Sequence, residues 1–397
     1  LAGVFLIIMG FCHFGSLIKF IPYTITTGFT SGIAVTIVIG QLKDFCGITY
    51  PDGVKPIETM EKLKAFAENF STISPDALIG GGVSLAILIV SPLIFKKIPG
   101  SLIAVIAGIL MVQFLPLHVS TIGNLYTISN ALPTLHLPVF DMKLIQSAIP
   151  NAFTIAVLAA IESLLSCVVA DGMINSKHRS DTELIAQGAG NIASALFGGI
   201  PATGAIARTA ANIKNGGRTP VAGMVHSITL VIVLVVLMPF AGMIPMPTIA
   251  AILFLVAYNM CQWRTFVHLV RKAPKSDIIV LFTTFVLTVV FDLVVAIEIG
   301  MVLACLLFIK RMSEETHADS WVYVDDDSPA VDEHLQKLPL EIRVYEITGP
   351  LFFGAADAIE HIVVKDFTKC LVLRMRSVPT IDSTAMNALQ NLSLIHI

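Results

Sequence analysis

The sequence predicts a polytopic α-helical membrane protein followed by a small soluble α/β module. Hydrophobic residues make up 55% of the 397 positions and charged residues only 13%, with a mean hydropathy of +0.83. Soluble domains normally carry about 25% charged residues. Acidic side chains are also unevenly distributed, since residues 314–397 hold half of the 28. We therefore expect residues 1–311 to form a membrane domain, residues 312–339 a linker, and residues 340–397 the soluble module.

Apolar runs divide the membrane domain into candidate helices. A membrane-spanning helix needs about 20 mostly apolar residues, and the shorter runs predict broken helices buried in protein. Residues 1–12 predict the second half of a helix whose beginning is missing, and Pro239 predicts a kink. The other predicted helices cover residues 21–41, 77–95, 100–115, 149–169, 184–200, 221–244, 246–260, 277–291 and 293–309.

Lysine and arginine favour one orientation in the membrane. If the last span ends in the cytoplasm, one set of loops holds most of the basic residues, and the positive-inside rule assigns that set to the cytoplasm. The set is Lys19, Lys96, Lys97, Lys177, Arg179, Lys214, Arg218, Arg264, Arg271, Lys272, Lys275, Lys310 and Arg311. The outer loops hold Lys43, Lys55, Lys62, Lys64 and Lys143. We expect a multi-pass protein of the cell (inner) membrane with its C-terminal module in the cytoplasm.

This orientation requires a short helix that begins in mid-membrane, and the stretch GGIPATGAIARTAANIKNGG (198–217) supplies one. The predicted helix, about 203–215, is too short to span. Its N-terminus would present unpaired amides and about half a positive charge, which favours an anion. Gly204 and Ala205 add little bulk, and Arg208 lies one turn on, on the same face. We predict an anion site here; alternatively, Arg208 pairs with a buried acid and only holds helices together.

Glu162 is the second charged residue in an apolar run, with Ser166 four residues on and on the same helix face. A lone carboxylate in hydrocarbon is costly unless it is paired or protonated. Three roles follow: Glu162 and Ser166 bind Na⁺ as a coupling ion, Glu162 carries H⁺, or Glu162 pairs with Arg208.

Other function classes find no support in the sequence. No Ser/His/Asp constellation, metal-ligand spacing or phosphate loop occurs, so no enzyme, catalytic residue or metal site is predicted, and no cofactor beyond a coupling Na⁺ or H⁺. The six cysteines form no CxxC pair, and no basic face with aromatic residues suits nucleic acid. In the C-terminal module, LEIRVYEITGPLFFGAADAIEHIV and KCLVLRMRSVPTIDSTAMNALQNL each predict a strand, a turn and a helix.

Several motifs resemble the SulP family of anion transporters. They are IESLLSCVVADGM, GNIASALFGGIPATGAIARTAANIKNGG and FDLVVAIEIGMVLACLLFIKRM, and the tail GPLFFGAADAIE with VLRMRSVPTIDSTAMNAL resembles its STAS domain. The resemblance implies a seven-plus-seven inverted-repeat transporter with half-helices, shared with uracil permease-like carriers, and a homodimer. It also implies a fragment truncated at both ends, without the third helix that supplies the opposing half-site.

The resemblance also implies roles for individual residues. Its anion site is lined by the positions of Gly204, Ala205 and Ile206, with Arg208 as the basic residue beside them. Glu162 and Ser166 match Na⁺-binding positions of bicarbonate-carrying members, which have Asp in place of Glu162 and Thr in place of Ser166. Those members also have Thr in place of Ile206. These departures weaken the expectation of Na⁺ and bicarbonate.

In the STAS part, Thr384 matches the phosphorylated position of soluble antagonists, with Ala385 in place of the usual Gly. A helix-start cap is the alternative role for this loop.

Together these features predict a secondary transporter, a symporter if Na⁺ or H⁺ is coupled, for small inorganic anions such as sulfate or bicarbonate. A carrier of dicarboxylates such as succinate, or of nucleobases, on the same fold is an alternative, and the STAS tail argues against nucleobases. A transport-dead membrane sensor that signals through STAS is the alternative from another class.

Overall fold

The computed structural model describes residues 1–16, 22–51, 53–95, 98–115, 117–126, 131–137, 141–291, 293–320, 341–360, 362 and 368–395. Lys19, Lys96 and Lys97, which the predicted topology assigns to the cytoplasm, lie outside the described residues, as does residue range 321–340 of the predicted linker. The chain forms two compact units, Leu1–Met301 and Val302–Ile397.

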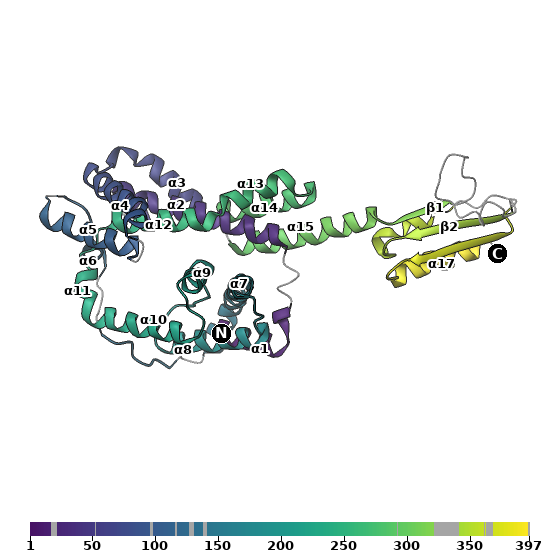
Figure 1. The fold of residues 1–397 in the computed structure, drawn as a ribbon, viewed down its shortest axis with the longest axis horizontal. Helices are drawn as coiled ribbons and strands as arrows, with labels where there is room; N and C mark the ends of the chain where they lie inside the picture. Colours follow the sequence, from purple (N-terminus) through teal and green to yellow (C-terminus); the bar gives the residue numbers. More distant parts are fainter. Residues whose placement is uncertain are drawn as a thin grey trace. The chain divides into compact units, whose positions relative to one another are not determined.

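Helices build the first unit (Figure 1). They are α1 (Ala2–Phe11), α2 (Tyr23–Cys46), α3 (Thr59–Glu68), α4 (Pro75–Ile94), α5 (Gly100–Phe114), α6 (Ile122–Leu125), α7 (Met142–Ile174), α8 (Ser180–Leu196), α9 (Ile206–Lys214), α10 (Val221–Ile232), α11 (Met238–Ala241), α12 (Met246–Cys261), α13 (Trp263–Lys272), α14 (Lys275–Val290) and α15 (Leu293–Glu314), which continues into the second unit. Among the described residues, five helical segments are long and apolar enough to span a membrane.

The helices expected from apolar runs are confirmed, with shifts of several residues at their ends. Among the described residues, the four-residue α6 and two longer helices, α3 and α13, were not predicted. Helices α3 and α13 are amphipathic rather than apolar, so a search for apolar runs passes over them. The expected break at Pro239 takes the form of a π-helical stretch, Val233–Leu237, directly before α11. Proline removes one backbone donor, which accounts for irregular helix at this point.

A first group of helices consists of α1, α7, α8 and α9. Leu6 of α1 and Leu184 of α8 are fully buried in the core that this group shares with α7. Glycines bring α1 and α8 together: a Cβ on Gly3 would lie 2.6 Å from the carbonyl oxygen of Gly188, and a Cβ on Gly188 would lie 2.5 Å from that of Gly3. Only glycine therefore fits at this crossing.

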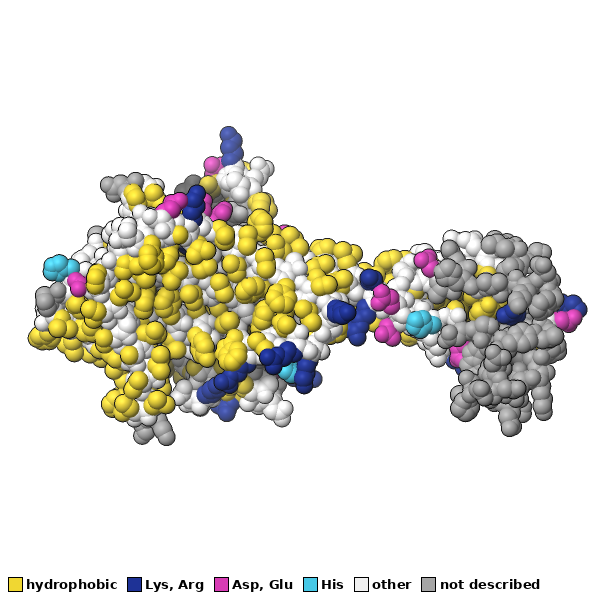
Figure 2. Space-filling view, turned by 90° about the horizontal axis from the view of Figure 1, so that it is seen from above, with side chains coloured by type: hydrophobic (Ala, Val, Ile, Leu, Met, Phe, Trp, Pro, Cys, Tyr) yellow, Lys and Arg dark blue, Asp and Glu magenta, His cyan; other side chains and the backbone are white. Residues whose placement is uncertain are grey.

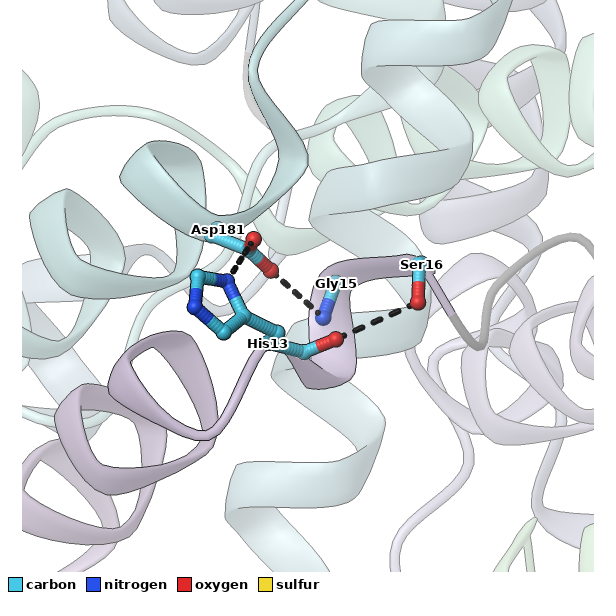
Figure 3. A network of polar contacts seen from close by, with 4 residues as sticks. All are labelled: His13, Gly15, Ser16 and Asp181. Atoms are coloured by element: carbon cyan, nitrogen blue, oxygen red, sulfur yellow. Dashed lines mark hydrogen bonds and ion pairs between the residues drawn. The ribbon is translucent and has the colours of Figure 1, made fainter.

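The end of α1 is also tied to the start of α8 by polar contacts (Figure 3). Asp181, in the first turn of α8, accepts a hydrogen bond from the Gly15 amide at 3.0 Å, and its other oxygen lies 2.7 Å from His13 Nδ1. Ser16 Oγ donates to the His13 carbonyl at 3.2 Å. An acidic residue in a first turn also complements the helix dipole.

A second group consists of α2, α4, α5, α12, α13 and α14. The motif GFTSG (28–32) lies in α2 at its contact with α14 and α12, where it serves close packing. Gly28 and Gly32 face α14, and the hydroxyl of Ser31, between them, donates to the Cys261 carbonyl at 2.7 Å. The Gly80–Gly82 stretch packs through its middle residue only, since a Cβ on Gly81 would meet the Phe45 ring.

We expect Gly32→Ala to destabilise the membrane unit by about 1–3 kcal/mol, because the added methyl overpacks the α2–α14 contact. A Cβ at this position would lie 2.6 Å from Thr288 Cβ and 3.2 Å from the Phe285 carbonyl oxygen. Gly40→Ala in the same helix is the control, since nothing lies within 4 Å of its Cβ position. Thermal unfolding in detergent should show a lower Tm for the first variant alone; an equal Tm for both would refute the packing argument.

The second unit holds a three-stranded sheet of β1 (His317–Ser320), β2 (Ile342–Thr348) and β3 (Cys370–Ser377) in that order. β1 and β2 are antiparallel, and β2 and β3 are parallel. Ile347, Leu351 and Ile359 are fully buried, with α17 (Ser383–Ile395) packed on the sheet. The second predicted strand–turn–helix is confirmed; of the first, α16 (Asp357–Glu360) is the described part of the helix. β1 lies within the predicted linker.

Candidate anion-binding site

The chain between α8 and α9 is non-helical backbone between two membrane helices. After α8 ends, Gly198 adopts the left-handed conformation with φ of +72°. Residues 199–205 carry no helix, and Ala205, which precedes the first turn of α9, is extended with φ of −91° and ψ of 116°. The half-helix therefore begins at Ile206 and not near 203 as predicted. Such backbone needs hydrogen-bond partners from protein, because lipid offers none.

Side chains of α8 supply the first set of partners. The amide of Ala202 donates to Asn191 Oδ1 at 2.8 Å, and Asn191 Nδ2 donates back to the Ala202 carbonyl at 2.9 Å. Gln187 Nε2 donates to the same carbonyl, and Ser194 Oγ donates to the Ile200 carbonyl at 2.9 Å. Asn191, which is only 8% exposed, thus satisfies both backbone groups of Ala202, as a neighbouring β-strand would do.

Side chains of α7 supply the second set. The Gly204 amide donates to Ser163 Oγ at 3.1 Å, and Ser163 Oγ and Thr203 Oγ1 share a hydrogen bond of 2.9 Å. Thr203 Oγ1 also donates to the Ala159 carbonyl at 3.2 Å, so Ser163 is the donor between the two hydroxyls. These bonds hold the start of α9 against α7 at Ser163, which is 1% exposed.

One turn further along α9, Ser166 of α7 donates to Thr209 Oγ1 at 2.8 Å. Ser166 is 4% exposed and was predicted as a cation ligand with Glu162. Its hydroxyl oxygen keeps lone pairs for a cation, because in this bond it acts as the donor. Glu162, one turn earlier in α7, is half-buried.

The residues predicted to line the anion site lie at the start of α9. Gly204, Ala205 and Ile206 are all half-buried. The Gly204 amide was expected among the anion's donors, but Ser163 already accepts its hydrogen bond. The amides of Ile206 and Arg208 have no acceptor among the described residues, as expected for the first turn of a helix. The donors available to an anion therefore begin after Gly204 rather than at it.

Arg208 and Glu162 are not joined in this structure. Arg208 is exposed, and the described residues provide it with neither an ion pair nor a hydrogen bond. Glu162 likewise has no partner within the described part of the chain. The alternative in which Arg208 serves to neutralise Glu162 thus has no ion pair to support it.

In the second unit, Asp382 provides the helix cap that was the alternative role for the Asp382–Thr384 loop. Its Oδ1 accepts from the Ala385 amide at 2.8 Å, and its Oδ2 accepts from the Phe353 amide at 2.8 Å. Thr384 is exposed in the first turn of α17.

Residues 1–284 match the sequence model of the sulfate permease family, and residues 336–394 match that of the STAS domain. The chain belongs to the sulfate permease family. Its relatives include YvdB of Bacillus subtilis, named provisionally as a sulfate transporter, which is 37% identical over 99% of this chain and 73% of its own length. The bicarbonate transporter BicA of Picosynechococcus is 34% identical over 98% of this chain and 70% of its own length.

Solved structures of this kind share the fold. The transmembrane domain of a cyanobacterial bicarbonate transporter BicA superimposes with a TM-score of 0.62 at 30% identity, over 76% of this chain and 74% of that chain. SLC26A9 superimposes with a TM-score of 0.82 at 20% identity, over 100% of this chain and 67% of that chain. The chain therefore has the helical membrane-transporter fold of these proteins with a STAS domain; the seven-plus-seven repeat stays a prediction.

Sequence reasoning missed the residues that position the half-helix. They are Ser163, Gln187, Asn191, Thr203 and Thr209. One signal was present: polar side chains occur in otherwise apolar α7 and α8 beside a break that needs partners. Gln187 and Asn191 are four residues apart and so share a face of α8.

Proposed function

We propose that the protein is a secondary transporter of small inorganic anions such as sulfate or bicarbonate, and that it binds the anion at the start of α9. The observation that carries this proposal is a half-helix whose first turn has amides without acceptors and is held against α7. Helix N-termini stabilise anions through these amides and the helix dipole. Arg208 follows within one turn, exposed and without a partner among the described residues, and adds a full charge.

Flux into vesicles tests this function. The full-length protein is reconstituted, and uptake of sulfate, bicarbonate and succinate is measured separately. We expect uptake of an inorganic anion. Uptake of succinate alone would favour the dicarboxylate carrier, and no uptake of any anion would favour the sensor. Neither alternative gains support from the relatives, which are named for sulfate or bicarbonate transport.

For coupling, we propose that Glu162 and Ser166 act together, as a Na⁺ site or with Glu162 as a proton carrier. Both lie on one face of α7, and Ser166 also contacts Thr209 of α9. A cation bound here would thus sit beside the element that binds the anion, so that each ion favours the other's binding.

Glu162→Gln is expected to give folded protein whose anion flux no longer responds to a Na⁺ or H⁺ gradient. The substitution keeps the shape of the side chain and removes its charge and its proton. Uptake is measured with and without each gradient, and elution from a sizing column checks the fold. Unchanged gradient dependence would leave Glu162 with a structural role only.

For orientation, we propose that residues 177–179, residues 271–275 and the STAS domain face the cytoplasm, and that the 44–76 and 116–146 regions face outside. Single cysteines at Lys177→Cys and Met60→Cys are exposed to an impermeant thiol reagent added outside. We expect labelling at position 60 and none at position 177 until the membrane is opened. The reverse pattern would overturn the orientation. Both variants are made in protein whose six native cysteines are replaced by serine.

A further inference from the structure

Helix α13 leaves the direction of α12 at a sharp backbone turn. Gln262, between the two helices, adopts the left-handed conformation with φ of +43° and ψ of 38°. A non-glycine residue rarely adopts it, so the turn is imposed by its surroundings. The Ser31 hydroxyl, which is bonded to the Cys261 carbonyl, fixes the end of α12 at this point. Met246–Lys272 is long and apolar enough to span a membrane as one segment, but the turn at Gln262 makes α13 a separate helix within it.

One face of α13 packs on α14. The ring of Phe266 lies 5.6 Å from that of Phe282 and 5.5 Å from that of Phe285, both edge-on. The opposite side carries the basic residues, which share spacings of three or four and are all exposed. They are Arg264, His268, Arg271 and Lys272, followed by Lys275 at the start of α14.

Among the described residues, these cations have no carboxylate partner. Lys64, Lys310 and Lys369 each lie within 4 Å of a glutamate. By contrast, no described carboxylate forms an ion pair with any basic residue of α13. The nearest acid along the chain, Asp277, accepts a hydrogen bond from Ser276 Oγ at 3.3 Å. Within the described part of the chain, the charge of this basic face is therefore not neutralised, although the Arg264 guanidinium lies 5.5 Å from the centroid of the Trp263 ring.

An exposed apolar and aromatic strip runs beside the basic face. Trp263 is 46% exposed and Val267 is 36% exposed, one turn apart. Trp263 Nε1 donates to the hydroxyl of Tyr258, itself 59% exposed, at 3.3 Å. Tryptophan and tyrosine are enriched at the boundary between lipid and water. Figure 2 shows lysine and arginine side chains gathered along one edge of the first unit, next to a broad hydrophobic face.

We propose that α13 lies in the membrane interface and binds the phosphate headgroups of anionic lipids. Trp263 and Val267 enter the acyl boundary, and Arg264, Arg271 and Lys272 contact the headgroups. Charge complementarity selects this occupant, because a basic amphipathic helix with exposed apolar residues binds anionic lipid surfaces. Because Phe266 packs α13 on α14, a lipid bound to α13 would also act on the position of α14.

Trp263 reports on its own lipid neighbours. The chain has two tryptophans, so Trp321→Phe leaves Trp263 as the only one in this chain. The protein is reconstituted in phosphatidylcholine vesicles that contain an equal fraction of brominated phosphatidylglycerol or brominated phosphatidylcholine. We expect stronger quenching by brominated phosphatidylglycerol and a loss of the difference at high salt. Equal quenching by the two lipids would overturn the proposal.

Variants without the basic side chains of α13 test whether the preference for anionic lipid arises there. Arg264→Gln, Arg271→Gln and Lys272→Gln together should abolish the preference, since each lost charge weakens lipid association about five-fold. Arg264→Lys with Arg271→Lys keeps the charge and should keep the preference. Lys55→Gln, Lys62→Gln and Lys64→Gln together remove three cations elsewhere and should change nothing. A preference that survives the first triple substitution, or is lost equally in the second, would contradict a site on α13.

Discussion

Arg208→Gln is expected to weaken anion binding about 10- to 150-fold in protein that still folds. A charge-assisted contact contributes about 1.5–3 kcal/mol, which corresponds to this range of affinity. Folding should be little affected, because Arg208 is exposed and has no partner among the described residues. Arg208→Lys should fall between, since lysine keeps the charge and loses the planar fork of donors. Calorimetric titration of the purified protein with sulfate and with bicarbonate measures the dissociation constants.

The double variant separates this role from charge neutralisation. No ion pair joins Arg208 and Glu162 in the described structure, so Arg208→Gln with Glu162→Gln should bind the anion no more tightly than Arg208→Gln alone. If the double variant recovered the parent affinity, the function of Arg208 would be to neutralise Glu162, and the anion contact would be refuted.

Asn191→Leu is expected to destabilise the protein by about 1–3 kcal/mol and to weaken anion binding at the same time. The amide of Ala202 would lose its acceptor, which leaves one part-buried backbone donor without a partner. The Ala202 carbonyl would keep its bond from Gln187. Because this loop leads into α9, a looser loop also loosens the first turn that binds the anion. Thermal unfolding and anion titration measure the two effects.

Asn215→Ala is the matched control. Asn215 Nδ2 donates to the Ala211 carbonyl at 2.8 Å, so the same kind of bond is lost, but at the exposed end of α9. Exposed substitutions usually change stability by less than about 0.5 kcal/mol. Losses of the same size in both variants would show that Asn191 has no special role in fixing the half-helix.

Hydropathy predicted most of the membrane unit because apolar length is what a lipid environment requires of a spanning helix. It missed α3 and α13 for the same reason, since both are polar along one face. The turn at Gln262 has no glycine or proline to indicate it, and the residue before it is hydrogen-bonded to α2. The sequence shows Ser31 within GFTSG, but the carbonyl to which its hydroxyl donates, that of Cys261, lies 230 positions away. No local pattern could therefore predict this contact.

The candidate site divides in the same way. Charge in an apolar run identified Glu162 and Arg208, and the break before α9 indicated a half-helix. The partners of the broken backbone depend on how α7 and α8 are rotated about their axes, which no local pattern specifies. The role of Ser163, next to Glu162, was therefore not predicted. Its hydroxyl accepts the hydrogen bond of the Gly204 amide, so the amides available to an anion begin after Gly204.

Protection of a single cysteine at Ala205→Cys by anions tests the central claim most directly. The native cysteines of the full-length protein are replaced by serine, and Asn215→Cys at the other end of α9 serves as the reference position. The rate of reaction with a small thiol reagent is measured with and without saturating sulfate or bicarbonate. If the anion binds at the start of α9, it slows the reaction at position 205 and leaves that at position 215 unchanged. Equal rates at position 205 with and without an anion that the protein transports would contradict the account.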